Sequence, residues 1–472
     1  MGVDNFRPYD QSQGAFRAII PNDLLELEHP ARIVDKVVEL LDLSEVYGWY
    51  QDEGSQPYHP KMMLKVLFYS YLTGTMSSRK MWEGLKDRAD YIFLSGDQVP
   101  DFRTLNRFRS RHLKQLPGLF AQIVHLCTKL GMIDFKYLAI DGQKIQADAS
   151  WRRSKTKRRL EQSMKRVTEG MRKLLEKEVS EDFPQETKQK RLAELARQEK
   201  ELLALKGMLE KIGEEKANIN MTDPEAKVMK HKDGRSLPSY NHQSAVDGRC
   251  GVTCAVKTED RCDGELDLLE LVDTAKENTG EGHENVMADS AFGGYQVFEK
   301  VEQERSEQFF VPDTRFAAGE KGEGDKGKFD GSRFEKREDG TVICPAGHPM
   351  VLTAERQEEI HTLRIYAGTA CEGCPLRENC TTAKRRTLNV DSREPLREQM
   401  REKLRTDRGR EIYMKRQGIV EAGHGDDQHN KGWRQHLLRG KAKAALEFML
   451  VRIGSNLGKI ATHKPRELLA LI

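Results

Sequence analysis

Two aspartates occupy the same sequence context and could bind metal ions. Asp141 follows the apolar run Tyr137–Ile140 and precedes a glycine, and Asp289 follows "NVMA" and precedes "SAFGG". This pattern predicts that each aspartate lies at the exposed end of a buried strand. Aspartates that end neighbouring strands can converge on cations that prefer oxygen ligands, as phosphodiester cleavage by two ions requires. Either aspartate alone could equally serve only to begin a turn.

A third group of carboxylates lies further along the chain, in "KRQGIVEAGHGDDQHNKGW" (415–433). Glu421, Asp426 and Asp427 stand there among basic residues, two histidines and four glycines. The spacing is compatible with a solvated loop, with a metal-binding histidine cluster, or with the last part of a catalytic site. It does not decide between them.

Four of the eight cysteines have the number and spacing of zinc ligands. "CPAGH" contributes Cys344, and "CEGCPLRENC" contributes Cys371, Cys374 and Cys380. Four thiolates, two of them in a C-x2-C pair, match a tetrahedral structural Zn²⁺ site. His348 could replace one cysteine, and the alternative is a set of buried thiols without a metal. The other four cysteines are expected to be small core residues: Cys127, Cys250, Cys254 and Cys262.

The formal net charge of +3 says little about partners, but the basic residues are clustered. Residues 103–114 include five Lys/Arg and no acid, and six of the eight residues 152–159 are basic. Such clusters predict a polyanionic partner, although a solvated helix face explains either one alone equally well. Neither a signal peptide nor an uncharged apolar run of membrane-spanning length is recognisable, so we expect a cytosolic protein without disulfides.

The elements that carry these residues fall into several segments. A chain of 472 residues predicts about two to four domains. Residues 30–119 have helical periodicity and end in the basic helix, which predicts either a nucleic-acid-binding module or an ordinary helical domain. Residues 151–217 have leucines every seven residues and predict a helical hairpin, bent at Phe183-Pro184, that packs within the chain. Strand patterns return in residues 240–313, and helices close the chain.

These motifs, in this order, resemble those of bacterial insertion-sequence transposases of the DDE superfamily. The N-terminal part is similar in "YHPKMMLKVLFYSYLTGTMSSRK" and in the basic "PDFRTLNRFRSRH". "AIDGQKIQADAS" resembles the first-aspartate motif, "TDPEAKVMK…YNHQSAVD" the segment after the inserted helices, and "ADSAFGGY" the second-aspartate motif. "CPAGH…CEGCPLRENC" resembles the cysteine cluster of the family, and "YMKRQGIVEAGHGDDQHNKGWRQHLLRG" the helix that supplies its glutamate. The resemblance covers nearly the whole chain.

The resemblance implies a mixed α+β fold with a helical N-terminal domain and an RNase H-like α/β catalytic core. A helical hairpin and a cysteine-rich, zinc-ribbon-like insertion would interrupt this core. The expected divisions are the helical DNA-binding domain (1–119), the first part of the core (120–150), the hairpin (151–220), the rest of the core sheet (221–315), the cysteine-rich insertion (316–390) and the C-terminal helices of the core (391–472).

The resemblance also implies the residues of the site. Asp141, Asp289 and Glu421 become a catalytic triad that binds two Mg²⁺ or Mn²⁺ ions. Tyr413 and Arg416 match a tyrosine and an arginine that precede the glutamate in the family. The expected DNA contacts of the N-terminal domain are Arg79, Lys80, Arg103, Arg107, Arg109 and Arg111. Four residues beside the glutamate are then expected to be peripheral: His424, Asp426, Asp427 and His429.

Two departures from the family pattern follow Glu421. The family typically has a lysine seven residues after the glutamate to contact DNA phosphate. This chain has Gln428 there, and Lys431, one turn further on, is the expected substitute. Gly423 and Gly425 replace bulkier apolar residues, and each glycine weakens a helix by about 1 kcal/mol. The glycines therefore predict a disturbed helix.

The expected function is that of a DNA transposase. It would bind the terminal inverted repeats of its element, cut a strand at each end, and transfer the freed 3′ hydroxyl to target DNA. Because two ends must be joined, we expect at least a dimer on double-stranded DNA. The alternatives are an RNase H-like nuclease without strand transfer and a catalytically inactive DNA-binding relic.

Overall fold

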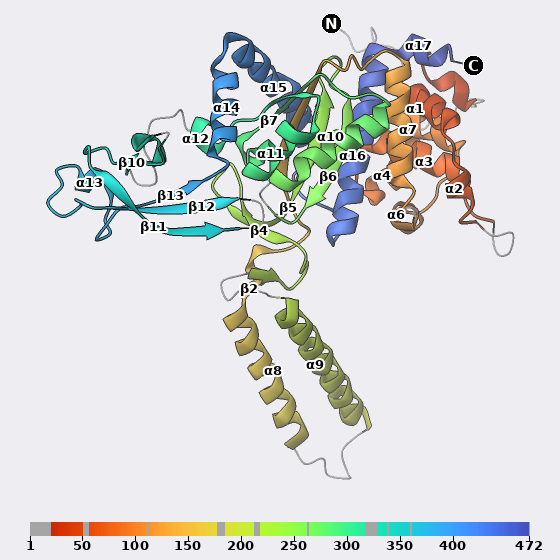
Figure 1. Ribbon diagram of the computed structural model, residues 1–472. Coiled ribbons are helices and arrows are strands. Elements are labelled where there is room, and N and C mark those ends of the chain that lie inside the picture. Colours follow the sequence, from red (N-terminus) through yellow and green to blue (C-terminus); the bar gives the residue numbers. More distant parts are fainter. Residues whose placement is uncertain are drawn as a thin grey trace, which may run out of the picture.

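The computed structural model describes residues 20–50, 56–111, 114–176, 185–211, 218–261, 264–317, 328–337, 339–358 and 361–471. Within these ranges the fold combines N-terminal helices, a central sheet covered by helices, and two insertions that project from the core (Figure 1). The predicted mixed class is confirmed. The predicted bend at Phe183-Pro184 and the predicted core residue Cys262 lie outside the described residues.

A six-stranded sheet lies at the centre of the molecule. Its strands are β1 (Tyr137–Gln146), β4 (Lys227–Lys230), β5 (Ser236–Asp247), β6 (Thr253–Glu259), β7 (Asn285–Ala288) and β8 (Gln308–Phe310). Their order is β4-β5-β1-β7-β8, and β6 also pairs with β5. β1, β7 and β8 are parallel, whereas β5 runs antiparallel to β1 and β6.

Strand β1 is longer than predicted. It does not end at Ile140 but continues through Asp141 to Gln146. The reason is its antiparallel neighbour β5, which pairs with β1 as far as Gln146 and so satisfies its backbone. On the other side β7 stops at Ala288, opposite Ile140. The prediction of an exposed strand end is therefore wrong for Asp141, and it is right for Asp289, which directly follows β7.

The helices before the sheet pack on a long helix near the end of the chain. They are α1 (Pro30–Leu40), α2 (Ser44–Tyr47), α3 (Pro60–Leu72), α4 (Ser78–Asp87), α5 (Ala89–Ser95), α6 (Phe102–Arg111) and α7 (Leu116–Lys129). The long helix, α16 (Lys441–His463), contacts α1, α3, α7 and strand β6 (Figure 1). Gly454 of α16 permits the close crossing with α3, because a Cβ there would lie 2.6 Å from the Tyr71 carbonyl carbon. One hydrophobic cluster therefore joins the N-terminal helices and the sheet.

The predicted division after residue 119 falls inside α7. This helix is continuous and packs on α10 and α16 of the core, so the two regions are joined by a helix. The remaining helices of the core are α10 (Leu268–Thr279), α11 (Tyr295–Glu304), α12 (Thr314–Ala317), α14 (Glu394–Arg405), α15 (Asp407–Gly425) and α17 (Pro465–Leu469).

The first insertion is the predicted helical hairpin. Helices α8 (Lys157–Glu176) and α9 (Gln185–Lys211) lie side by side and extend away from the sheet (Figure 1). At their base, β2 (Ser154–Thr156) pairs with β3 (Asn218–Asn220). The hairpin packs within the chain, as predicted: Leu160 of α8, Leu205 of α9 and Ile219 of β3 form one small buried cluster.

The second insertion carries the cysteines on an antiparallel sheet of its own. Its strands stand in the order β13-β12-β11-β10-β9. The bounds are β9 (Glu335–Lys336), β10 (Val342–Ile343), β11 (Pro349–Gln357), β12 (Thr362–Gly368) and β13 (Thr387–Asp391), with the short helix α13 (Arg377–Cys380) before β13. This sheet has a separate hydrophobic cluster, which includes Phe334, Tyr366 and Leu388.

Candidate active site

The strand register places Asp141 and Asp289 next to each other. Ile140 of β1 pairs with Ala288 of β7, and in both strands the following residue is the aspartate. The Asp289 carboxylate accepts a hydrogen bond from the backbone N–H of Ala291 at 2.9 Å, which begins a short 3₁₀ turn. Two carboxylates from parallel strands thus meet at one edge of the sheet.

Helix α15 brings Glu421 to the same edge. The helix packs on β1 and β7. The Glu421 carboxylate is exposed and accepts a hydrogen bond from Gln417 Nε2 at 3.0 Å. A cleft of about 590 Å³ separates this part of α15 from the sheet, and both Glu421 and Asp289 line it. Asp141 itself is not among the lining residues; the two residues after it, Gly142 and Gln143, are.

The electrostatic environment of Asp141 opposes its ionisation. Burial raises the pKa of this carboxyl; Arg416 lowers it, and the like charge of Asp289 raises it again. The partners that stabilise the anion are a hydrogen bond from the Gly142 N–H at 2.9 Å and Arg416 Nη1 at 3.6 Å from Asp141 Oδ1. Burial is therefore the main cause that opposes ionisation of Asp141, and the charge of Asp289 adds to it.

Arg416 and Tyr413 lie on the side of α15 that faces this pair. Among the described residues, Arg416 Nη1 is buried without a hydrogen-bond partner. The guanidinium carbon lies 5.8 Å from the centre of the Tyr413 ring. Burial raises the pKa of Tyr413, which the Arg416 charge partly offsets, so the phenol is protonated at neutral pH. Both side chains can donate hydrogen bonds to an anion.

His424 also lies in the cleft, although the sequence predicted a peripheral position. Its Nδ1 is 3.6 Å from Asp141 Oδ2, and it lines the cleft beside Glu421. Burial lowers the pKa of His424 to about 3, with smaller contributions from Arg452, Lys232 and Arg416, so the imidazole is neutral. The signal that could have found it is its spacing of three residues from Glu421, which places both on one helix face.

Lys431 does not reach the cleft, contrary to the expectation that it replaces the family's lysine. Its Nζ donates to Ser455 Oγ at 2.7 Å and pairs with Asp426 Oδ2 at 3.0 Å. The residue at the family's lysine position, Gln428, does line the cleft.

The glycines after Glu421 do not break the helix. Helix α15 runs through Gly423 and ends at Gly425, and a π-helical turn, Asp426–Asn430, follows. A Cβ on Gly425 would meet no atom within 4 Å, and one on Gly423 would meet Arg452 Nη1 at 3.2 Å. In the π-helical turn, Asp427 is fully buried and paired with Arg452.

Three lysines that the sequence analysis missed line the cleft. Lys144 belongs to β1, while Lys230 and Lys232 lie at the turn between β4 and β5. Lys144 Nζ donates to the backbone carbonyl of Lys230 at 3.0 Å, which ties the turn to β1. The basic stretch "KHKDGR" was the available signal, but only the sheet shows that it faces the aspartates.

The basic residues of the N-terminal helices form a second, separate groove. This groove of about 460 Å³ is lined by Arg79 of α4, by Arg103 and Arg107 of α6, and by Leu437 from the segment before α16. The guanidinium carbons of Arg79 and Arg103 lie 5.3 and 5.6 Å from the centre of the Phe102 ring. Lys80 and Arg111 are exposed but are not part of the lining.

Arg109 is buried and has a structural role, unlike the exposed Arg103 and Arg107 of the same helix. Its side chain is buried, and it donates to the Tyr71 hydroxyl at 2.9 Å and to the Met76 carbonyl at 3.2 Å. A third hydrogen bond joins it to Asn106 Oδ1 at 2.7 Å. Arg109 also lines the basic groove, but because its donors hold α6 against α3 the structure does not favour it as a DNA contact.

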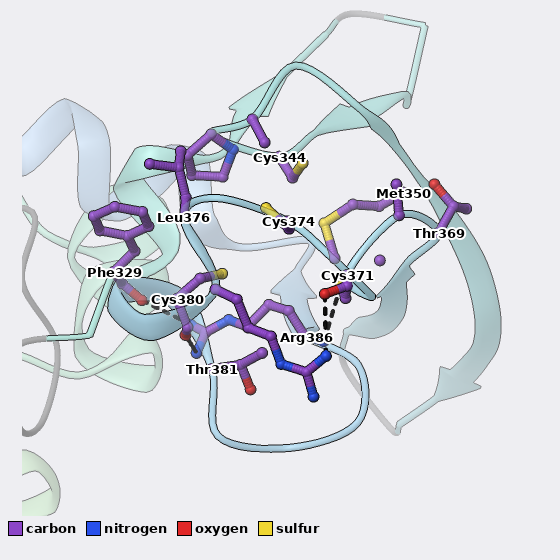
Figure 2. Close-up of a pocket in the computed structure, with 15 residues that line it drawn as sticks. Phe329, Cys344, Met350, Thr369, Cys371, Cys374, Leu376, Cys380, Thr381 and Arg386 are labelled. Carbon is purple, nitrogen blue, oxygen red and sulfur yellow. Dashed lines mark hydrogen bonds between the residues drawn. The ribbon is translucent and has the colours of Figure 1, made fainter.

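The four predicted zinc ligands surround one small cavity of about 20 Å³ (Figure 2). Burial raises the pKa of Cys380, which Arg386 lowers and the other three cysteines raise. None of the four forms a disulfide. Gly368 makes room for Cys371, since a Cβ there would lie 2.5 Å from its Sγ. His348 is exposed and outside the lining, so the structure does not favour it as a replacement ligand.

In the described part of the chain, no three His, Cys, Asp or Glu side chains lie close enough together to hold a metal ion. No described helix combines the length and hydrophobicity needed to cross a membrane.

Two family models match the chain. Residues 343–461 match "Transposase DDE domain", a segment that contains Glu421 and the four cysteines of the second insertion. Residues 20–111 match "Transposase domain (DUF772)", which covers the helices that form the basic groove. No curated protein and no solved structure matches the chain.

Proposed function

We propose that this chain, which belongs to the insertion-sequence DDE transposases, cuts and joins DNA strands at the ends of its own element. The observation that carries the proposal is the arrangement of three carboxylates: Asp289 and Glu421 line one cleft, and Asp141 stands beside Asp289 in the strand register. Two come from adjacent parallel strands, and the third from the segment that matches the DDE domain. The antiparallel strands β6-β5-β1 followed by the parallel β7 and β8 support an RNase H-like core.

The donor set at the cleft fits Mg²⁺ or Mn²⁺, which prefer carboxylate oxygens. The repulsion between Asp141 and Asp289 is what a divalent cation would relieve. Glu421 is exposed, so its carboxylate has room to move towards them. Bound by these three residues, two such ions would supply an activated water and stabilise the leaving oxygen of the phosphodiester.

The other residues of the cleft suit the phosphate of the scissile strand. Arg416 has an unused buried donor, and a guanidinium can bind two phosphate oxygens at once. The protonated Tyr413 offers a further hydrogen bond. Lys230 and Lys232 are exposed at the rim of the cleft. They supply the positive charge for DNA phosphate that the family's lysine provides and that the uncharged Gln428 cannot provide.

The basic groove of the N-terminal helices is the proposed contact with the terminal repeats. Arg79, Arg103 and Arg107 present their charges there, and such contacts to phosphate position the DNA without reading its sequence. Because the reaction joins two element ends, the active form is at least a dimer on DNA.

The cysteine cluster is the proposed Zn²⁺ site. Its four thiols converge from three parts of one insertion and fit tetrahedral coordination in number and type. Metal analysis of the purified full chain should find about one zinc per molecule. Cys374→Ser should lose it, whereas Cys250→Ser, outside the cluster, should retain it. Equal zinc content in both variants would contradict the assignment.

A strand-cleavage assay on element-end DNA with Mg²⁺ and a supercoiled target tests the function. The wild type should release the 3′ end and form joined products. Asp289→Asn should lower cleavage at least about 1,000-fold, equivalent to about 4 kcal/mol in the barrier. Asp407→Asn is the matched control. Asp407 is an exposed aspartate in the first turn of α15, the helix that carries Glu421, and the variant should retain activity.

The same assay separates the alternatives. Cleavage without any joined product would indicate a nuclease that lacks strand transfer. Wild-type cleavage no faster than that of Asp289→Asn would indicate a DNA-binding relic.

A further inference from the structure

A second large cleft borders a different face of α15 from the one that carries Glu421. Its volume is about 930 Å³, and it lies between α15, the C-terminal half of α16 and the β5–β6 turn. Its lining residues on the first side fall between Lys415 of α15 and Asp426 just after it, and on the second side between Arg452 and His463 of α16. At 1.5 Å per residue each helix borders roughly 16 Å of the cleft, the length of about five nucleotides at 3.4 Å per step along one DNA strand.

The unpaired positive charge of this cleft comes from Arg249 and Lys459, since Lys415 pairs with Glu411, Lys431 with Asp426 and Arg452 with Asp427. The basic lining residues are Arg249, Lys415, Lys431, Arg452, Lys459 and His463. Within the described chain, Asp426 is the one acid among the lining residues, and Lys431 already neutralises it. Arg249 and Lys459 form no ion pair with any described acid. Lys459 Nζ lies close to the β5–β6 turn, 3.3 Å from where a Cβ on Gly251 would be.

Two helical glycines in the cleft have no structural explanation. Gly418 of α15 and Gly458 of α16 both line it, and a Cβ on either would meet no atom within 4 Å. Glycine inside a helix is unfavourable, so packing alone would favour a larger residue at both positions. A glycine there leaves the helix backbone open to close approach by a ligand.

We propose that this second cleft binds the phosphate backbone of a DNA duplex, separately from the strand whose phosphate reacts at the aspartates. Three features together suit a surface that binds a phosphate backbone: the unpaired cations of Arg249 and Lys459, a groove longer than a small anion needs, and the two glycines that leave the helix backbone accessible. The proposal rests on the proposed function, because it takes DNA as the substrate. Helix α15 would then contact DNA on one face and carry Glu421 on another.

Salt-dependent binding of the full chain to a duplex without element ends, in EDTA, tests this proposal. Arg249→Ala/Lys459→Ala should lower affinity at least about tenfold and reduce the slope of log K against log salt by about 1.8, since each phosphate contact contributes about 0.9. Lys276→Ala/Lys300→Ala removes the same charge from exposed positions on α10 and α11, which line neither cleft, and should change affinity less than twofold. Gly418→Glu should also weaken binding, with helix content unchanged by circular dichroism.

Equal affinity losses in the two double variants would assign the effect to net charge and overturn the proposal. Wild-type binding by Arg249→Ala/Lys459→Ala or by Gly418→Glu would overturn it as well. The assay requires no cleavage, so a failure of the proposed catalytic activity would leave its result interpretable.

Discussion

Two carboxylates in successive turns near the end of α15 have opposite environments. Asp427 is fully buried and paired with Arg452, with Lys431 Nζ at 3.7 Å and a hydrogen bond from Gln143 Nε2 at 3.4 Å. Glu421, six residues earlier, is exposed at the cleft and accepts one hydrogen bond, from a neighbour on its own helix. The first carboxylate holds the fold together, and the second is available to a ligand.

The arginines beside them show the same difference. Arg452 is paired with the buried carboxylate of Asp427, whereas Arg416 lies 3.6 Å from Asp141 at the cleft; each guanidinium has buried nitrogen atoms without a hydrogen-bond partner in the described chain. An unsatisfied buried polar group costs about 1–3 kcal/mol. At the cleft a ligand that accepts a hydrogen bond from Arg416 would offset this cost, whereas Arg452 already has the Asp427 carboxylate beside it.

The largest expected effect is on stability, from the paired side of this comparison. Arg452→Ala should lower the free energy of unfolding by about 3–5 kcal/mol, because it leaves the buried Asp427 charge uncompensated. Arg416→Ala, the matched change in the cleft, should cost less than about 1 kcal/mol. Urea unfolding followed by circular dichroism measures both. Equal costs would remove the distinction between the two arginines.

The N-terminal helices should give an intermediate effect. Arg109→Ala should lower the free energy of unfolding by about 2–3 kcal/mol, since it removes hydrogen bonds from a buried charged group. Arg107→Ala, two residues away in the basic groove, should change stability by less than about 0.5 kcal/mol and weaken duplex binding. Thermal unfolding and fluorescence anisotropy measure the two effects, and a stability loss at Arg107 would contradict the assignment.

The smallest expected effect concerns the glycines. Gly425→Ala should raise the free energy of unfolding by up to about 1 kcal/mol, because the added methyl has open space and alanine favours the helix. Gly454→Ala should do the opposite, since its Cβ would collide with the backbone of α3. Chemical denaturation of both variants measures the signs. Destabilisation by Gly425→Ala would show that the end of α15 depends on this glycine.

Periodicity and the resemblance were sufficient to predict the mixed fold and the helical hairpin. The positions of individual side chains depended on tertiary partners that a local pattern does not contain. Strand β1 continues past Asp141 because β5 pairs with it. Arg109 is buried because Tyr71, far earlier in the chain, accepts its hydrogen bond.

The same limit applies within the site. Lys431 lies one helical turn after Gln428, yet it follows the π-helical turn and its side chain contacts α16. His424 could have been found from its spacing of three residues, but only the register of β1 shows that an aspartate lies beside it.

Binding of Mn²⁺ to the full chain, followed by electron paramagnetic resonance of the free ion, tests the central claim most directly. If Asp141 and Asp289 are ligands of one cation site, Asp141→Asn and Asp289→Asn should each weaken Mn²⁺ binding at least about tenfold, or 1.4 kcal/mol. Asp407→Asn should bind as the wild type does. Wild-type affinity in both aspartate variants would contradict the account.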